Sequence, residues 1–201
     1  MKKIGLIVCL LLIGSFAQAK EKAKRMSISS ASWVNDEDIG SDFVFKGMGC
    51  EGKNQSPEVS WKDLPKNAKS LAVTVYDPDA PTGSGWWHWI IYNIPVTMTG
   101  LPQGFGEMGK RKLKGGPIQN MTDFGDVGYG GPCPPAGDSP HHYFLKVYAL
   151  DVEKLDIPEK ASGAMAGFNI NQHIVAEAGL TGFYAREGYG SMIQKHDAEK
   201  K

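Results

Sequence analysis

Three short segments of the chain gather side chains that can bind ions or exchange protons. Asp77 and Asp79 lie two residues apart, and the prolines beside them restrict the backbone so that both carboxylates can point the same way. His88 lies among three tryptophans, and His141, His142 and Tyr143 follow a loop rich in Gly and Pro. Imidazolium N–H groups and a tyrosine hydroxyl can donate hydrogen bonds to a phosphate, and carboxylates can accept them from an ammonium group. Together these residue types could hold a small charged group.

Each segment also has a purely structural interpretation. Asp77 could close a strand through an ordinary Asx turn. A single histidine in an apolar strand, such as His88, is often a hydrogen-bonded core residue. Adjacent strand residues point to opposite sides of a sheet, so only one of His141 and His142 can join a given site. Spacing alone leaves these alternatives open.

The elements that must position these side chains are mostly strands. Alternating apolar residues, or a high density of aromatic and β-branched residues, predict three long strands over residues 71–77, 86–94 and 143–150. Shorter strands are expected at 43–45, 59–61 and 182–184. With 25 glycines and 12 prolines, the chain has the turn content of a β-rich fold.

Two expectations follow from periodicity within these elements. Regular alternation over 86–94 would place His88 and Trp86 on one face of the strand, and Trp87 and Trp89 on the other. A stripe at helical spacing predicts one helix that ends near Gly179, with a face formed by Ala164, Phe168, Asn171, Val175 and Ala178.

The N-terminus predicts an exported protein. Lys2 and Lys3 precede an apolar run, and Ala17-Gln18-Ala19 supplies the small residues that a signal peptidase requires. We therefore expect residues 1–19 to be a cleaved signal peptide, with no membrane segment left after cleavage and a periplasmic or secreted mature chain. Without Lys2 and Lys3, 20 basic residues face 22 acidic ones, so the composition does not favour a nucleic-acid partner.

Export leaves two cysteines, Cys50 and Cys133, in an oxidising compartment. They are expected to form a disulfide, with two buried thiols as the alternative. No cofactor is indicated. The run from Gly104 to Gly109 matches the dinucleotide pattern GxGxxG, but it lacks the preceding strand and following helix that the motif needs.

The segments taken together resemble the phosphatidylethanolamine-binding protein family, in particular its bacterial branch, often called Raf-kinase-inhibitor-like. The resemblance rests on five blocks in the same order: Cys50 to Pro57, Asp77 to Pro81, Gly85 to Trp89, Gly130 to Gly137, and His141-His142-Tyr143. It covers about residues 26–186, which defines one domain followed by a polar tail over 187–201. Eukaryotic relatives usually have His-Arg-Tyr at the last block, where this chain has His142 in the arginine position.

The resemblance implies a large antiparallel sheet packed with a smaller sheet, few peripheral helices and a small anion-accepting cavity at one end. By motif position it assigns a ligand-binding role to Asp77, Asp79, Trp86, His88, Pro135, His141 and Tyr143, and it leaves the role of His142 open. It implies neither a metal nor catalysis.

The expected ligand is a small anionic or zwitterionic group such as a phosphoethanolamine headgroup. A carboxylate beside each histidine should favour the charged imidazolium, whereas Asp77 and Asp79 would oppose a bare dianion. The protein is thus expected to be a non-enzymatic binder, with a possible further role as an inhibitor or modulator of other proteins. The alternative is a metal-dependent hydrolase, because two His and two Asp can bind zinc and leave a position open for water.

Overall fold

The computed structural model describes residues 25–186. The signal-peptide and tail predictions fall on segments 1–24 and 187–201, outside the described residues. The fold is mainly β, as expected, with one helix among the described residues. Its elements are β1 (Ser27–Ser29), β2 (Glu37–Asp38), β3 (Lys46–Gly47), β4 (Cys50–Glu51), β5 (Val59–Lys62), β6 (Ser70–Asp77), β7 (Trp86–Pro95), β8 (Gly100–Leu101), β9 (Ile118–Gln119), β10 (His141–Leu150), α1 (Gly163–Asn171) and β11 (Ile174–Tyr184).

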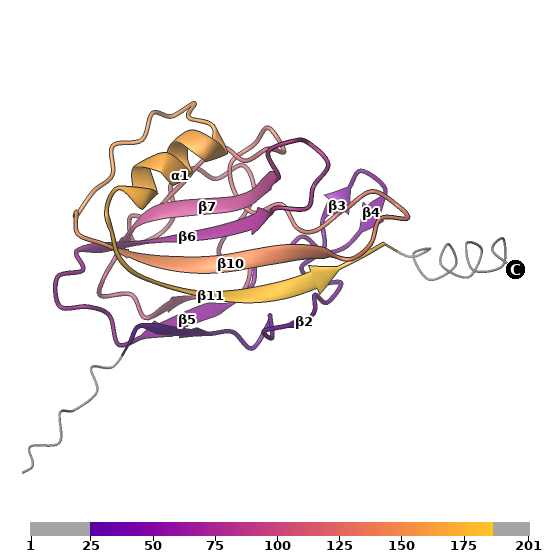
Figure 1. Cartoon of the computed structure of the whole chain (residues 1–201). Helices are drawn as coiled ribbons and strands as arrows, with labels where there is room; N and C mark the ends of the chain where they lie inside the picture. Colours follow the sequence, from indigo (N-terminus) through magenta and orange to yellow (C-terminus); the bar gives the residue numbers. More distant parts are fainter. Residues whose placement is uncertain (1–24, 187–201) are drawn as a thin grey trace, which may run out of the picture.

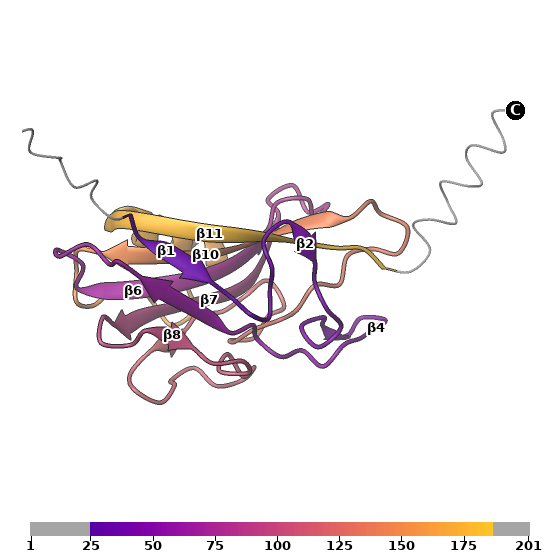
Figure 2. The ribbon, with the colours of Figure 1, turned by 90° about the horizontal axis from the view of Figure 1, so that it is seen from below.

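Three layers build the domain. A six-stranded sheet runs in the order β2-β11-β10-β6-β7-β9. Its long strands β6, β7, β10 and β11 are antiparallel to one another, whereas the short edge strand β2 pairs in parallel with β11. A three-stranded sheet, β1-β5-β8, faces one side of it (Figure 2). Helix α1 covers the other side, over β7 (Figure 1). The predicted combination of a large and a smaller sheet is confirmed.

Two apolar cores separate the layers. The larger core lies between the sheets and joins Val59 and Trp61 of β5 to Leu71, Val73 and Val75 of β6, all fully or almost fully buried. The smaller core lies between the large sheet and α1, and includes Ala72, Ile90 and Ile170. Because both faces of β6 are covered, seven of its eight residues are buried. This strand therefore holds its last residue, Asp77, in a rigid position.

The predicted helix was only partly right. It ends at Asn171, and residues 174–184 form β11, which pairs with β10 along its whole length, so that Gly179 lies opposite Lys146. This pairing outweighs the helical spacing of Val175 and Ala178. The buried face of α1 also differs from the expected stripe.

The face of α1 that packs on the sheet consists of small residues. Gly163, Ala166, Gly167 and Ile170 are buried, whereas Phe168 is 62% exposed. A Cβ at Gly163 would lie 2.4 Å from the Trp87 ring, so glycine there allows the helix to lie against the indole. The large residues of the expected stripe could not have approached so closely.

A β-bulge corrects the expected facing of the tryptophans. Val75 pairs with Trp89 and Tyr76 with Trp87, so His88 is an extra residue in β7. After such an insertion the alternation changes phase. Trp87 therefore packs in the core beneath α1, while Trp89 packs between the sheets. The short strand expected at residues 43–45 is also absent, because residues 41–44 form turns and the strand begins at Lys46.

Candidate functional site

A cavity of about 190 Å³ opens at the end of the large sheet where β6 ends and β7 and β10 begin. Its floor carries Asp77, His88, His141 and Tyr143. The remaining lining residues are mostly apolar. Trp86 begins β7, and the others come from the β3–β4, β6–β7 and β9–β10 loops: Met48, Ala80, Pro81, Thr82, Phe124, Cys133, Pro134 and Pro135. Among residues 25–186, no Lys or Arg lines this cavity.

Asp77 forms the junction between strand and site. Its Oδ1 accepts hydrogen bonds from the backbone N–H groups of Asp79, at 2.8 Å, and Ala80, at 3.1 Å. Its Oδ2 accepts a 2.8 Å hydrogen bond from His141 Nδ1. Asp77 thus closes an Asx turn and also orients a histidine. Its structural interpretation and its place in the site are therefore compatible.

His141 lies between two carboxylates. Its ring is 4% exposed, with Nδ1 on Asp77 and Nε2 at 3.4 Å from Oδ2 of Asp138. Both partners are acceptors, an arrangement that suits a ring protonated on both nitrogens. Asp138 belongs to the loop before β10, and no motif in the sequence pointed to it.

His88 has a different environment. Its ring is buried, and Nδ1 lies 2.7 Å from the carbonyl oxygen of Gly130, which can only accept, so Nδ1 carries the proton. Burial lowers the pKa of His88 from 6.5 to about 4 and outweighs the opposing effects of the Gly130 carbonyl and the Asp77 charge. The expectation that a carboxylate beside each histidine keeps it charged is therefore wrong for His88, which is neutral at pH 7.

The bulge and two glycines bring His88 to this position. The Gly130 N–H donates to the His88 carbonyl at 2.9 Å, and the Gly130 carbonyl accepts from the His88 ring. These two hydrogen bonds join the loop to the bulge. A Cβ on Gly130 would lie 2.4 Å from the Phe124 ring, and one on Gly131 would lie 2.0 Å from the Phe43 carbonyl oxygen. Glycine at both positions permits this close approach.

Tyr143 supplies a hydroxyl with no partner. The residue is fully buried, and its Oη has no hydrogen-bond partner among the described residues. Burial, followed by the charge of Asp77 and by the closeness of its carboxylate to the hydroxyl, raises the pKa of Tyr143, so the group remains a phenol at physiological pH. The contact with Asp77 lacks the geometry of a hydrogen bond. A buried polar group without a partner is unfavourable, and a ligand in the cavity could supply one.

Asp79 and His142 lie beside the cavity and do not line it. The Asp79 carboxylate accepts hydrogen bonds from the His142 backbone N–H and ring Nδ1, both at 2.7 Å, and both side chains are partly exposed. Burial opposes ionisation of Asp79, but the hydrogen bonds from His142 outweigh it and lower the pKa of Asp79. The structure thus brings together six of the seven predicted site residues and leaves Asp79 outside.

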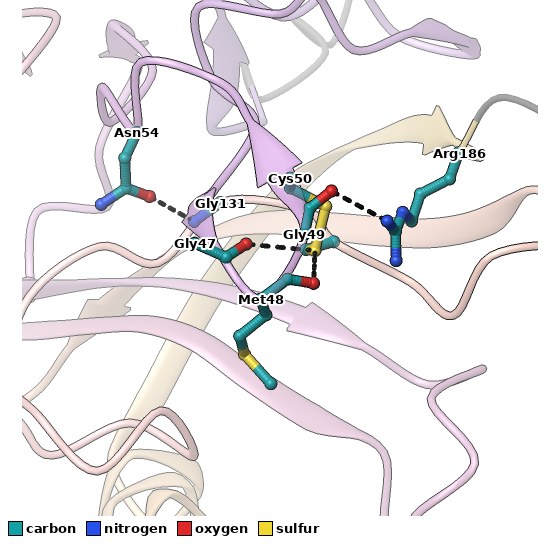
Figure 3. Close-up of a disulfide and its surroundings, with 8 residues drawn as sticks. Gly47, Met48, Gly49, Cys50, Asn54, Gly131 and Arg186 are labelled. Carbon is teal, nitrogen blue, oxygen red and sulfur yellow. Dashed lines mark hydrogen bonds between the residues drawn. A yellow bond between two sulfur atoms is a disulfide. The ribbon is translucent and has the colours of Figure 1, made fainter.

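A disulfide holds one wall of the cavity (Figure 3). Cys50 and Cys133 are joined with their Cα atoms 6.0 Å apart, which confirms the predicted bond. It ties the β3–β4 hairpin, whose tip carries Met48, to the loop that carries Pro134 and Pro135. Arg186 donates to the Gly49 carbonyl at 2.8 Å, and Asn54 accepts from the Gly131 N–H at 2.8 Å, so both sides of the wall are fixed.

Two residues that line the cavity, and Asp138 beside it, escaped the sequence analysis. Phe124 contacts Trp86 edge to face at 5.4 Å and His88 at 5.3 Å, yet it comes from a loop with no periodicity. Met48 is 69% exposed at a hairpin tip and had no signal either. Asp138 had a weak signal, as an acidic residue three positions before a histidine in a rigid Pro and Gly loop.

Comparison with known proteins agrees with this architecture. The phosphatidylethanolamine-binding protein family model matches residues 29–185, and the chain belongs to this family. Among similar proteins, YbcL of Escherichia coli is 46% identical over 170 residues, covering 85% of this chain and 93% of its own. YbhB of the same organism is 51% identical over 142 residues, which cover 71% of this chain and 89% of YbhB.

Solved structures show the same fold. The crystal structure of Escherichia coli YbcL, described as a new member of the mammalian family, superposes with a TM-score of 0.78, covering 82% of this chain and all of that one. A phosphatidylethanolamine-binding protein homologue from Chlamydia trachomatis, 31% identical, gives a TM-score of 0.67 over 81% of this chain and 99% of its own.

Proposed function

We propose that the cavity binds a small phosphorylated headgroup of the phosphoethanolamine type, and that the protein is an exported binder without catalytic activity. The observation that carries the proposal is the unpartnered Tyr143 hydroxyl, buried beside His141 on the floor of the cavity. This hydroxyl and an N–H of His141 are two donors suited to phosphate oxygens.

The rest of the lining favours a zwitterion. Trp86 and Phe124 offer aromatic faces that can attract an ammonium group. His88, protonated on Nδ1, presents Nε2 as an acceptor. Asp77 is fully engaged by three donors, so it contributes negative charge and leaves direct contact with the ligand to its neighbours.

Two further observations bear on the alternatives. Within residues 25–186, no group of three or more His, Cys, Asp or Glu side chains is placed to hold a metal ion, so the hydrolase alternative gains no support. Over the same range, no helix is long and apolar enough to cross a membrane. A role as an inhibitor of other proteins stays a prediction.

Calorimetry with phosphoethanolamine and inorganic phosphate tests the proposal. We expect wild-type protein to bind phosphoethanolamine, and Tyr143→Phe to bind it about tenfold more weakly, as expected for one lost hydrogen bond to a charged group. Vesicles with and without phosphatidylethanolamine then show whether the headgroup is recognised within a lipid. Absence of binding to phosphoethanolamine, or phosphatase activity that a chelator abolishes, would contradict the proposal.

A further inference from the structure

Asp138 lies beside the cavity without lining it, and its carboxylate contacts the ring of His141, which does line the cavity. Its Oδ2 lies 3.4 Å from His141 Nε2, the ring nitrogen that Asp77 leaves available. A phosphate that used this nitrogen as a donor would have to take the position of Asp138 or share it at close range. The Asp138 carboxylate therefore competes with an anionic ligand for His141 Nε2.

The two carboxylates that flank His141 differ in how firmly they are held. The Asp77 side chain is 3% exposed and is fixed by two backbone N–H groups in addition to the ring. The Asp138 side chain is 40% exposed, and its carboxylate has no other hydrogen bond in the part of the chain that the structure describes. A separation of 3.4 Å is long for a charge-assisted hydrogen bond. Asp138 can therefore move away while Asp77 stays.

A rigid turn keeps Asp138 close even after such a movement. Its backbone N–H donates to the Pro135 carbonyl at 3.3 Å, and Gly137 between them has φ of 95°. This left-handed conformation favours glycine at the third position of a tight turn. Pro135 itself lines the cavity. A side chain released from His141 thus remains at the entrance.

The charges around the floor favour the same role. The groups that interact with His141 are Asp77, Asp138, Asp79 at longer range, neutral His88 and the Tyr143 phenol. With the carboxylates ionised and the His141 ring charged, the sum of these charges is negative, and no Lys or Arg of the described part of the chain lines the cavity. A dianion alone is therefore repelled, whereas a ligand that also carries a cation can neutralise the excess.

We propose that Asp138 determines the specificity of the cavity: it binds His141 Nε2 in the empty site and, once displaced by a phosphate, faces the ammonium group of a zwitterionic ligand. This inference rests on the proposed function. It predicts that the site prefers phosphoethanolamine to ethyl phosphate, which has a similar shape but no amine.

The experiment compares these two compounds by calorimetry in wild-type protein and in Asp138→Asn. Asparagine keeps the size of the side chain and removes its charge. We expect the variant to bind ethyl phosphate about tenfold more tightly, which corresponds to about 1.4 kcal/mol of binding free energy. It should bind phosphoethanolamine more weakly, so that the preference for this compound disappears. The nitrogen chemical shift of His141 Nε2 should also change in the ligand-free variant.

Asp151→Asn is the matched control. Asp151 also binds a histidine, His173, at 2.9 Å, but it lies just beyond the opposite end of β10 and should leave both affinities unchanged. If Asp138→Asn still prefers phosphoethanolamine to ethyl phosphate, or if the Nε2 shift is unchanged, the role of Asp138 is overturned while the proposed function stands. A wild-type protein that binds neither compound would overturn the proposed function and this inference with it.

Discussion

The two cavity histidines are almost equally buried, yet their neighbours give them different chemistry. His141 has carboxylate acceptors at both nitrogens, whereas His88 is hydrogen-bonded to one backbone carbonyl, packs against aromatic rings and feels the Asp77 charge without direct contact. Burial without a charge partner disfavours the protonated ring. His88 is therefore a neutral group, and only His141 is placed to supply a charged donor.

The pKa of His88 predicts a specific loss of stability in acid. Because the folded pKa of about 4 lies below the ordinary value of 6.5, the unfolded chain binds the proton more readily. The stabilisation is present above pH 6.5 and falls as the pH is lowered towards 4, by about 3 kcal/mol. Urea unfolding of wild-type protein and His88→Asn from pH 7.5 to 4 should show this extra loss in wild-type protein only. Parallel curves would show that His88 takes up its proton as readily in the folded state.

Two buried tyrosines provide a matched test of binding against stability. Tyr143 has no partner for its hydroxyl, whereas the Tyr129 hydroxyl donates to the Phe43 carbonyl at 2.8 Å. Tyr143→Phe should weaken binding of phosphoethanolamine with no loss of stability. Tyr129→Phe should keep the binding and lose about 1–2 kcal/mol, because a buried carbonyl loses its donor. Thermal melts and calorimetry on both variants measure this. A destabilised Tyr143→Phe would mean that its hydroxyl has a structural role.

Residue types alone identified most of the floor of the cavity but not its surroundings. Asp77, His88, His141 and Tyr143 are polar residues at strand ends, where a sequence pattern is informative. Asp79 has the same appearance, yet the direction of its side chain depends on His142, a neighbour from another strand. Phe124 and Met48 come from loops, where long-range packing places a side chain and no local pattern reports it.

At the scale of elements, irregularities in the sheet and the loops beside it build the site. The bulge at His88 turns that ring towards the cavity. Trp87 then packs in the core beneath α1, and Trp89 packs in the core between the two sheets. The sequence predicted β6, β7 and β10 because their periodicity is strong. It could not predict the bulge, which changes the phase within one strand. It predicted β11 only over residues 182–184, because the conformation of the rest of this strand depends on pairing with β10.

The disulfide should matter for both stability and the cavity. It closes a loop with a sequence separation of 83 residues, so the chain-entropy estimate for its removal is about 4 kcal/mol. The double variant Cys50→Ser with Cys133→Ser should lose about this much in urea unfolding and should also bind phosphoethanolamine more weakly, because the Met48 hairpin is released. Met48→Ala, with the disulfide intact, isolates the contribution of that side chain. Unchanged binding in the double variant would show that the wall holds its place without the bond.

At the scale of the whole molecule, two sheets and a helix give the cavity a rigid frame. β6, which ends at Asp77, is buried on both faces, and β7 and β10 on either side of it carry the two histidines. A ligand therefore meets groups that are already in position, which reduces the entropy lost on binding. The loops that close the frame depend on a covalent bond, and this bond depends on the compartment in which the chain folds.

The last prediction concerns export. A leader of residues 1–19 would deliver the chain to an oxidising compartment, where the Cys50–Cys133 bond is stable, whereas cytosolic reductants would keep both thiols reduced. Full-length protein expressed in a bacterial host should therefore be found in the periplasm or medium, begin at Lys20 and contain no free thiol. Cell fractionation locates the protein, intact mass gives the first residue, and thiol titration under denaturing conditions counts the free thiols. A version without residues 1–19, kept in the cytoplasm, is the control and should show two free thiols and lower stability. An exported protein that retains residues 1–19 would contradict cleavage, and two free thiols in it would show that export does not drive formation of this bond.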